Sequence, residues 1–363
     1  MYRTALFSDL VSYPWPVVNN ALSEPRTLCY YVGFWIPSAF VGKMFGYQVG
    51  YYFQLVWAYA GVLLAFSLLT EYLRKVSIKA ALLLICFSGL DIAIYILYKI
   101  RLHESAAILG ELLSGEHIEL MLGKFNSSSN TTLLFWLYNQ TIPFWIGFLL
   151  LLQQKSNRSR LFTFMLLVLF APFPAVALIP FIIYQFLREF KKGDSIPKKQ
   201  LSVFLRDCFT VENITGFVVG AMIALYFLSN AAVQKIGLSV KNRGDIIQLL
   251  LFLMSEYAVY LVLIQKTARK DGTLIVLLST MVLCSFVQLG NSNDFAWRTC
   301  IPSAFYLMIL VMKSLLDKTE RPQWKRAMLI AVILIGCITP LMEFVRTTEH
   351  TAAYYSGSKS DDD

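Results

Sequence analysis

Apolar stretches long enough to cross a lipid bilayer recur from about Gly50 to Phe344, and short segments between them carry most of the charge. A hydrocarbon core of roughly 30 Å requires about 20 apolar residues in a helix. Only 15% of the 363 residues are charged, whereas a soluble domain has about a quarter. We therefore expect an all-α integral membrane protein, because helices satisfy their own backbone hydrogen bonds in lipid.

The apolar pattern predicts about eight full spans and one broken segment. The broken segment, 161–187, contains Pro172, Pro174 and Pro180 and has basic residues at both ends. Proline interrupts a helix, so we interpret this segment as a re-entrant hairpin of two half-helices, with one tilted span as the alternative. The expected full spans are 50–72, 80–98, 132–153, 216–233, 246–265, 273–289, 301–316 and 327–344.

Four segments are expected outside the full spans of the transmembrane domain, which covers residues 50–344. Residues 1–49 contain four prolines and are expected to lie outside or at the interface. A polar loop is expected at 99–131 and a basic cytoplasmic linker at 188–200. The polar composition of 345–363 predicts a flexible tail.

The net charge of +9 reflects membrane orientation rather than nucleic-acid binding, because the basic residues cluster beside apolar runs. Lysine and arginine prefer cytoplasmic loops, so the loops 99–131 and 290–300 are expected outside. The loop 234–245 is an exception, since Lys241 and Arg243 would also be outside. They are either scattered charges or contacts for a phosphate. The clusters expected in the cytoplasm lie at 74–79, 155–160, 188–199, 266–270 and 318–326.

Two acidic residues fall inside expected spans. Asp91 lies in the second span and Glu256 in the fifth. A carboxylate at membrane depth is costly and often functional. The alternative for each residue is a hydrogen bond between helices that has no further role.

The expected outside loops carry further polar candidates. Glu116 and Glu119 are one helical turn apart and could face one cavity together with His117, or form a solvated surface. The polar run 126–132 is expected to cap the third span. Asp294 and Arg298 are four residues apart and could pair, or Arg298 could hold a phosphate.

Known cofactor signatures are not recognisable. The sequence has no nucleotide-binding glycine loop and no zinc-protease motif. The six cysteines are not spaced as metal ligands and are expected to be small buried hydrophobes. No cofactor is therefore certain, and a divalent metal is possible but not required.

Several motifs together resemble a family of bacterial polytopic membrane proteins. These proteins are similar to glycosyltransferases of the GT-C structural type, which use sugars linked to lipid phosphates. The resemblance covers most of the chain. Its motifs are Ser12–Val17, Tyr30–Lys43, Ser88–Asp91, His117–Glu119, Thr131–Trp136 with Asn139 and Gln140, and Asn293–Arg298 with Ile301 and Pro302.

The resemblance implies a polyprenyl-phosphate sugar donor, a glycan or lipid acceptor, and an active site facing outward from a bacterial plasma membrane. It implies a carboxylate base in the first outside loop, for which Asp9 matches, and Glu119 could also serve. Arg298, helped by Lys241 or Arg243, would hold the lipid phosphate. Family members have a helix and further acids ahead of Asp9, so the chain looks truncated at both ends.

Two other functions remain open from the residues alone. A transporter or lipid flippase would use the intramembrane acids Asp91 and Glu256. A scaffold subunit of a biosynthetic complex would need neither the acids nor the outside loops. An outside cavity that joins Asp9, Glu119 and Arg298 beside a lipid groove would favour the transferase. A passage through the bilayer lined by Asp91 and Glu256 would favour the transporter.

Overall fold

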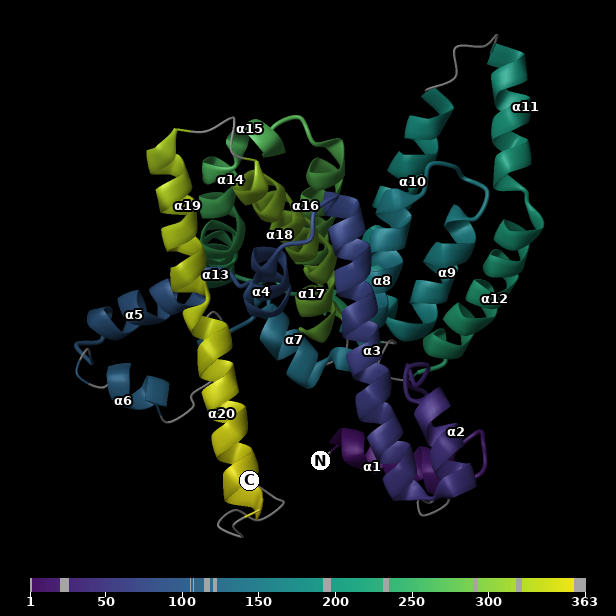
Figure 1. Ribbon diagram of the computed structural model, residues 1–363, viewed down its shortest axis with the longest axis horizontal. Coiled ribbons are helices and arrows are strands. Elements are labelled where there is room, and N and C mark those ends of the chain that lie inside the picture. Colours follow the sequence, from purple (N-terminus) through teal and green to yellow (C-terminus); the bar gives the residue numbers. More distant parts are fainter. Residues whose placement is uncertain are drawn as a thin grey trace. The chain divides into compact units, whose positions relative to one another are not determined.

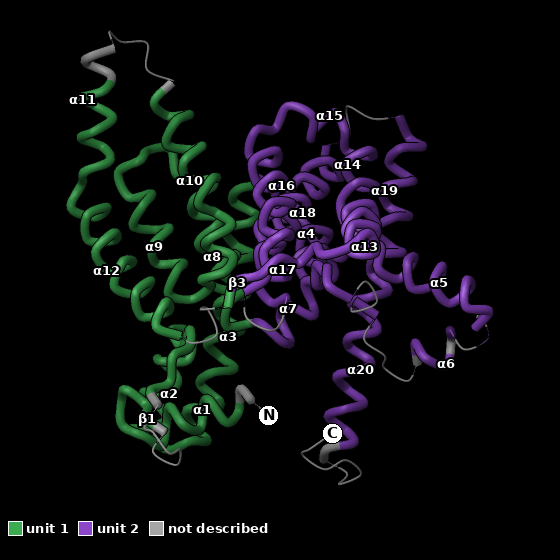
Figure 2. Tube along the Cα trace, turned by 180° about the vertical axis from the view of Figure 1, so that it is seen from behind, with its two compact units in different colours: residues 1–72, 138–235 green, residues 73–137, 236–363 purple. Residues whose placement is uncertain are grey.

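The computed structural model describes residues 2–19, 26–104, 106, 108–113, 118–119, 123–191, 197–230, 235–289, 293–317 and 322–355. These residues are mostly helical (Figure 1) and divide into two compact units (Figure 2). Unit 1 contains residues 1–72 and 138–235, and unit 2 contains residues 73–137 and 236–363. Each unit is described by itself.

Unit 1 is a group of helices in which α9 packs against α8, α10 and α12. The close approach of α9 and α12 depends on glycine, because a Cβ at Gly216 would lie 2.6 Å from the Cα of Phe162. The elements of unit 1 are α1 (Tyr2–Ser12), β1 (Val18–Asn19), β2 (Arg26–Thr27), α2 (Ile36–Phe45), α3 (Tyr47–Leu73), α8 (Tyr138–Gln153), α9 (Arg160–Phe170), α10 (Pro172–Lys191), α11 (Pro197–Cys208) and α12 (Val211–Leu228).

The proline-rich segment 161–187 is broken, as its prolines predict. Helix α9 ends at Phe170 and α10 begins at Pro172, and the two helices pack against each other. The two halves are unequal, because Pro172–Phe190 of α10 has the length and composition of a full span. Helix α10 also extends into the expected linker 188–200, which continues as α11 from Pro197. Re-entry of this segment into the membrane stays a prediction.

Unit 2 is built around α18. In the candidate span that contains α18, 83% of the residues are buried, against 17% in α3 of unit 1. A helix that is apolar on all sides and buried forms the centre of a helical bundle. The elements of unit 2 are α4 (Ile78–Cys86), α5 (Asp91–Arg101), α6 (Ile108–Leu113), α7 (Asn130–Trp136), β3 (Ile236–Leu238), α13 (Arg243–Leu253), η4 (Met254–Ala258), α14 (Val259–Leu263), α15 (Gln265–Ala268), α16 (Gly272–Cys284), β4 (Val287–Leu289), α17 (Asp294–Thr299), α18 (Ile301–Leu316), α19 (Gln323–Gly336) and α20 (Ile338–Tyr355).

Several expected spans are interrupted. The span expected at 80–98 is a pair of helices, α4 and α5, bent by 46° at a break over residues 87–90. The break contains Ser88 and Gly89, a pairing that often kinks helices. The span at 246–265 contains η4, one turn of π-helix. The span at 132–153 is divided at Leu137 between α7 and α8.

The helix ends also differ from expectation in two places. Helix α16 ends at Cys284, and residues 287–289 of the expected span form β4, which pairs with β3. Helix α20 continues to Tyr355, so the expected flexible tail 345–363 is helical over 345–355. Apolar composition therefore predicted helical structure in these segments but did not define where their helices stop.

The described residues include six helices long and apolar enough to cross a membrane, or seven if α4 and α5 form one bent span. This agrees with a multi-pass helical membrane protein. The expected count of about eight spans is not confirmed.

Candidate functional site

Two helix irregularities meet in unit 2. The break at residues 87–90 frees backbone groups that need partners, and η4 and α14 provide them. The backbone N–H of Leu90 donates to the carbonyl of Ser255 (3.2 Å), and the Tyr260 hydroxyl donates to the carbonyl of Ser88 (2.8 Å). Single π-helical turns are frequent at functional sites. The helix break and η4 therefore form one local structure.

The two acids that the sequence places in expected spans lie at this meeting point. Asp91 is the first residue of α5 and Glu256 lies in η4, and their side chains are hydrogen-bonded to each other. Each residue is 5% exposed, and each retains one carboxyl oxygen without a partner, Oδ2 of Asp91 and Oε1 of Glu256. Two carboxyl groups can share a hydrogen bond only when a proton lies between them. The structure thus joins two residues that the sequence presented separately.

A third acid, Glu119, is buried beside this pair. Its Oε1 accepts the backbone N–H of Ser129 (3.0 Å) and the hydroxyl of Thr132 (2.7 Å). Burial raises the pKa of Glu119 to about 7, although these hydrogen bonds act to lower it. The charge of Glu119 acts on both Asp91 and Glu256, so the three carboxyl groups form one electrostatic cluster. We call these three residues the acid cluster.

The burial of Glu119 distinguishes between the two alternatives for this residue, and its contacts confirm a further prediction. Glu119 is only 3% exposed, which agrees with a cavity-facing side chain and not with a solvated surface. The expected cap at the start of the third span is present, because the Ser129 side chain accepts the backbone N–H of Thr132 at the first turn of α7. Glu119 completes this cap from outside the helix.

The segment 129–132 also holds the helix break in place. The backbone N–H of Asn130 donates to the carbonyl of Phe87 (3.0 Å), and its side chain donates to the carbonyl of Leu84 (2.9 Å). The Thr131 hydroxyl donates to the carbonyl of Ile85 (2.9 Å). These bonds satisfy carbonyls at the end of α4, which a broken helix leaves without intrahelical partners.

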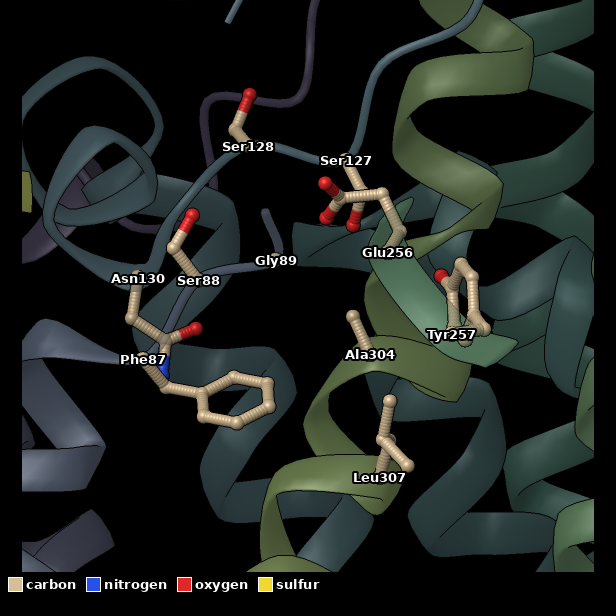
Figure 3. Close-up of a pocket in the computed structure, with 10 residues that line it drawn as sticks. All are labelled: Phe87, Ser88, Gly89, Ser127, Ser128, Asn130, Glu256, Tyr257, Ala304 and Leu307. Atoms are coloured by element: carbon tan, nitrogen blue, oxygen red, sulfur yellow. The ribbon is translucent and has the colours of Figure 1, made fainter. Parts of the chain in front are cut away.

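A small polar cavity adjoins the acid cluster (Figure 3). Its volume of about 10 Å³ is close to the space that roughly one water molecule needs. The hydroxyl of Ser88, which is 4% exposed, has no hydrogen-bond partner there. The lining residues are Phe87, Ser88, Gly89, Ser127, Ser128, Asn130, Glu256, Tyr257, Ala304 and Leu307.

A fourth acid that the sequence reasoning missed lies near Glu119. Glu343 of α20 accepts the indole N–H of Trp136 (2.5 Å) and pairs with Arg346 (2.8 Å). Its charge contributes to the raised pKa of Glu119. Glu343 could have been found by the criterion that selected Asp91 and Glu256, because it is an acid within the expected span 327–344.

The expected phosphate-binding residues also lie in unit 2. Arg298 and Asp294 form the predicted pair (3.4 Å), and the Arg298 side chain is 13% exposed. Lys241 and Arg243 are exposed at the start of α13. The ammonium group of Lys124 pairs with Asp245 of α13 (2.6 Å).

The backbone of Lys124 connects α17 to the segment 123–132 through hydrogen bonds. Its carbonyl accepts the side-chain N–H groups of Asn293 and Trp297, each at 2.8 Å. The chain runs from Lys124 through Ser127 and Ser128 of the cavity to the α7 cap. The segment 123–132 therefore contacts three of the sequence regions that carry the family resemblance, 88–91 through its cavity and 118–119 and 293–298 through hydrogen bonds.

Three site predictions stay untested. Glu116 and His117 lie outside the described residues. Asp9 lies half-buried in α1 of unit 1, whereas Glu119 and Arg298 lie in unit 2. Within the ranges that the structure describes, no three His, Cys, Asp or Glu side chains are placed to hold a metal ion.

Comparisons of this chain with protein-family models, with curated proteins and with solved structures found no match.

Proposed function

We propose that the chain is a membrane glycosyltransferase of the GT-C type, in which the acid cluster supplies the base that activates the acceptor. One observation carries this proposal. Segments that resemble the family, 88–91, 118–119 and 131–136, contribute Asp91, Glu119 and Thr132 to one buried polar centre. Side chains drawn from several separate motifs are typical of catalytic centres.

Glu119 has the properties that a general base requires. A catalytic base works best when its pKa is near the working pH, and burial raises the pKa of Glu119 to about 7. Its Oε2 atom has no hydrogen-bond partner among the described residues, so this oxygen is the one that would accept a proton. Glu119 is therefore the preferred base, and Asp9 is the other proposed base.

The proposed reaction inverts the configuration at the anomeric carbon of the sugar. Glu119 removes the proton from an acceptor hydroxyl, and the acceptor oxygen forms a bond to the anomeric carbon of the donor. The bond between that carbon and the polyprenyl-phosphate oxygen breaks, and the electron pair leaves with the phosphate. Arg298, Lys241 and Arg243 are the proposed cations that stabilise the departing phosphate.

A proton-coupled transporter is the second candidate, and a different observation favours it. The buried carboxyl groups of Asp91 and Glu256 are paired beside a helix break, and transporters commonly place their coupling sites at such breaks. The cavity beside them, about 10 Å³ in volume, admits roughly one water molecule rather than a sugar. A transferase must open this region when it binds its substrates, whereas a proton site needs no such opening.

Membrane vesicles that contain the full chain distinguish the candidates. For the transferase, we expect transfer of labelled sugar from a polyprenyl-phosphate donor to a membrane acceptor. Transfer should fall at least about 100-fold in Glu119→Gln, the lower range for loss of a general base. Glu212→Gln, a change at an exposed residue of α12, is the matched control and should retain activity.

The opposite results are equally informative. Normal transfer in Glu119→Gln removes Glu119 as the base. Proton flux that requires Asp91 and Glu256, without sugar transfer, favours the transporter. The absence of both sugar transfer and proton flux would favour a scaffold subunit of a biosynthetic complex.

A further inference from the structure

The cavity presents two hydrogen-bonding atoms that nothing in the described structure satisfies. These are Oε1 of Glu256 and Oγ of Ser88, whose residues are 5% and 4% exposed. A buried polar atom without a partner costs about 1–3 kcal/mol. Both residues line the cavity, so a group that donates hydrogen bonds there would remove this cost.

The charge of the site shows what kind of donor fits. The three carboxyl groups of the acid cluster make this site acidic. Within the residues that the structure describes, no Lys, Arg or His forms an ion pair with Asp91, Glu119 or Glu256. Buried charges in proteins are usually paired, so a cation is the partner that would stabilise an ionised carboxylate here.

The geometry favours an ammonium group over a metal ion. In the described ranges, no three acidic side chains are positioned as ligands for a metal. An ammonium group has three N–H donors on one compact atom, and the cavity of about 10 Å³ is close to the size of one water molecule. A primary amine therefore matches the cavity in size, charge and hydrogen-bonding character.

We propose that this cavity binds the protonated amino group of a small ligand, with Glu256 as its counter-ion and Ser88 as a second acceptor. Asp91 is a positioning residue, because its hydrogen bond fixes the Glu256 carboxyl group. This inference goes beyond the proposed transferase and does not require it. The amine competes with a second proton on the Asp91–Glu256 pair, so its binding weakens as the pH falls.

Other titratable groups lie near the Asp91–Glu256 pair. They contribute to the pH dependence of amine binding. They come from the segment before α7, from η4 and α14, and from the junctions that precede α18 and α20. They are Glu119, Tyr257, Tyr260, Cys300 and Cys337.

Calorimetric titration of the full chain in phosphatidylcholine nanodiscs tests the proposal, with methylammonium as the probe and sodium as the comparison ion. We expect saturable binding of methylammonium and no saturable binding of sodium. Glu256→Gln should weaken binding at least about tenfold, equivalent to 1.4 kcal/mol. Glu212→Gln is the exposed control and should bind normally.

Asp91→Asn tests whether Asp91 acts by positioning Glu256 or through its own charge. The asparagine amide can donate to Glu256 and keep it ionised, so methylammonium binding should persist and depend less on pH. Ser88→Ala should weaken methylammonium binding several-fold without changing the charge of the cavity. This variant therefore tests the site even if Glu256→Gln fails to fold.

Three results overturn the proposal. They are equal binding of sodium and methylammonium, no binding of methylammonium to the folded chain, and unchanged binding in both Glu256→Gln and Ser88→Ala. Loss of sugar transfer in Glu119→Gln does not affect this inference, and loss of amine binding does not affect the transferase.

Discussion

The carboxyl group of Glu256 occupies the space that a side chain at Gly89 would fill. A Cβ at position 89 would lie 2.1 Å from the carboxyl carbon and oxygens of Glu256. The helix break thus depends on glycine because a buried acid packs directly against its backbone.

Gly89→Ala is therefore expected to displace Glu256 and destabilise the protein by about 1–3 kcal/mol, the usual cost of overpacking. The measurement is the thermal unfolding of the purified protein in detergent, together with methylammonium binding, which should weaken. Gly110→Ala in α6 is the matched control, because a Cβ there meets no atom within 4 Å. Equal stability of the two variants would contradict the close packing at Gly89.

Glu119 should make stability depend on pH. Its pKa rises from 4.5 in the unfolded chain to about 7 in the fold, so the folded state binds the proton more tightly. The free energy of unfolding should fall by about 3 kcal/mol as the pH rises from about 4.5 through 7, because the buried group must then ionise. Glu119→Gln should remove this dependence, as measured by denaturation at a series of pH values. A variant with the same pH dependence as the natural chain would show that other groups cause it.

Arg346→Met should be strongly destabilising. The side chains of Arg346 and Glu343 are 13% and 5% exposed, and their atoms approach to 2.8 Å. Removal of one partner from a buried pair leaves the other charge uncompensated, at a cost of about 3–5 kcal/mol. Thermal unfolding should show this loss.

Arg206→Met is the control for that pair, because the Arg206 side chain is 70% exposed and lies 4.0 Å from Asp207. Exposed pairs contribute about 0–1 kcal/mol, so this variant should unfold close to the natural protein. Similar losses of stability in both variants would show that burial does not distinguish the two pairs.

The orientation in the membrane is also testable. Single cysteines placed at Glu104 and at Lys270, in a background without the six natural cysteines, should differ in labelling by a reagent that cannot cross the membrane. Position 104 should be labelled from outside intact cells and position 270 only after the cells are opened. The reverse pattern would place the basic clusters outside and exclude the proposed outward-facing site.

The sequence by itself determined features that depend on neighbouring residues. Apolar composition predicted a multi-pass helical protein, and the first of the three prolines at 172, 174 and 180 marks the break between α9 and α10, whereas Pro180 lies inside α10. The four-residue spacing predicted the Asp294–Arg298 pair, and the polar run before α7 predicted its cap. The break, the pair and the cap each lie within one or two helical turns, where sequence spacing fixes distance in space.

Only the tertiary structure decided which distant residues meet. Asp91, Glu119 and Glu256 lie far apart in the chain. The sequence placed Glu119 in a polar loop, facing a cavity or solvent, and the other two residues in separate spans. They meet because the helix break at 87–90, the π-helical turn η4 and the capped start of α7 satisfy one another's backbone groups. Hydrophobic periodicity reports which face of a helix is buried, but it carries no information about the partner that buries it.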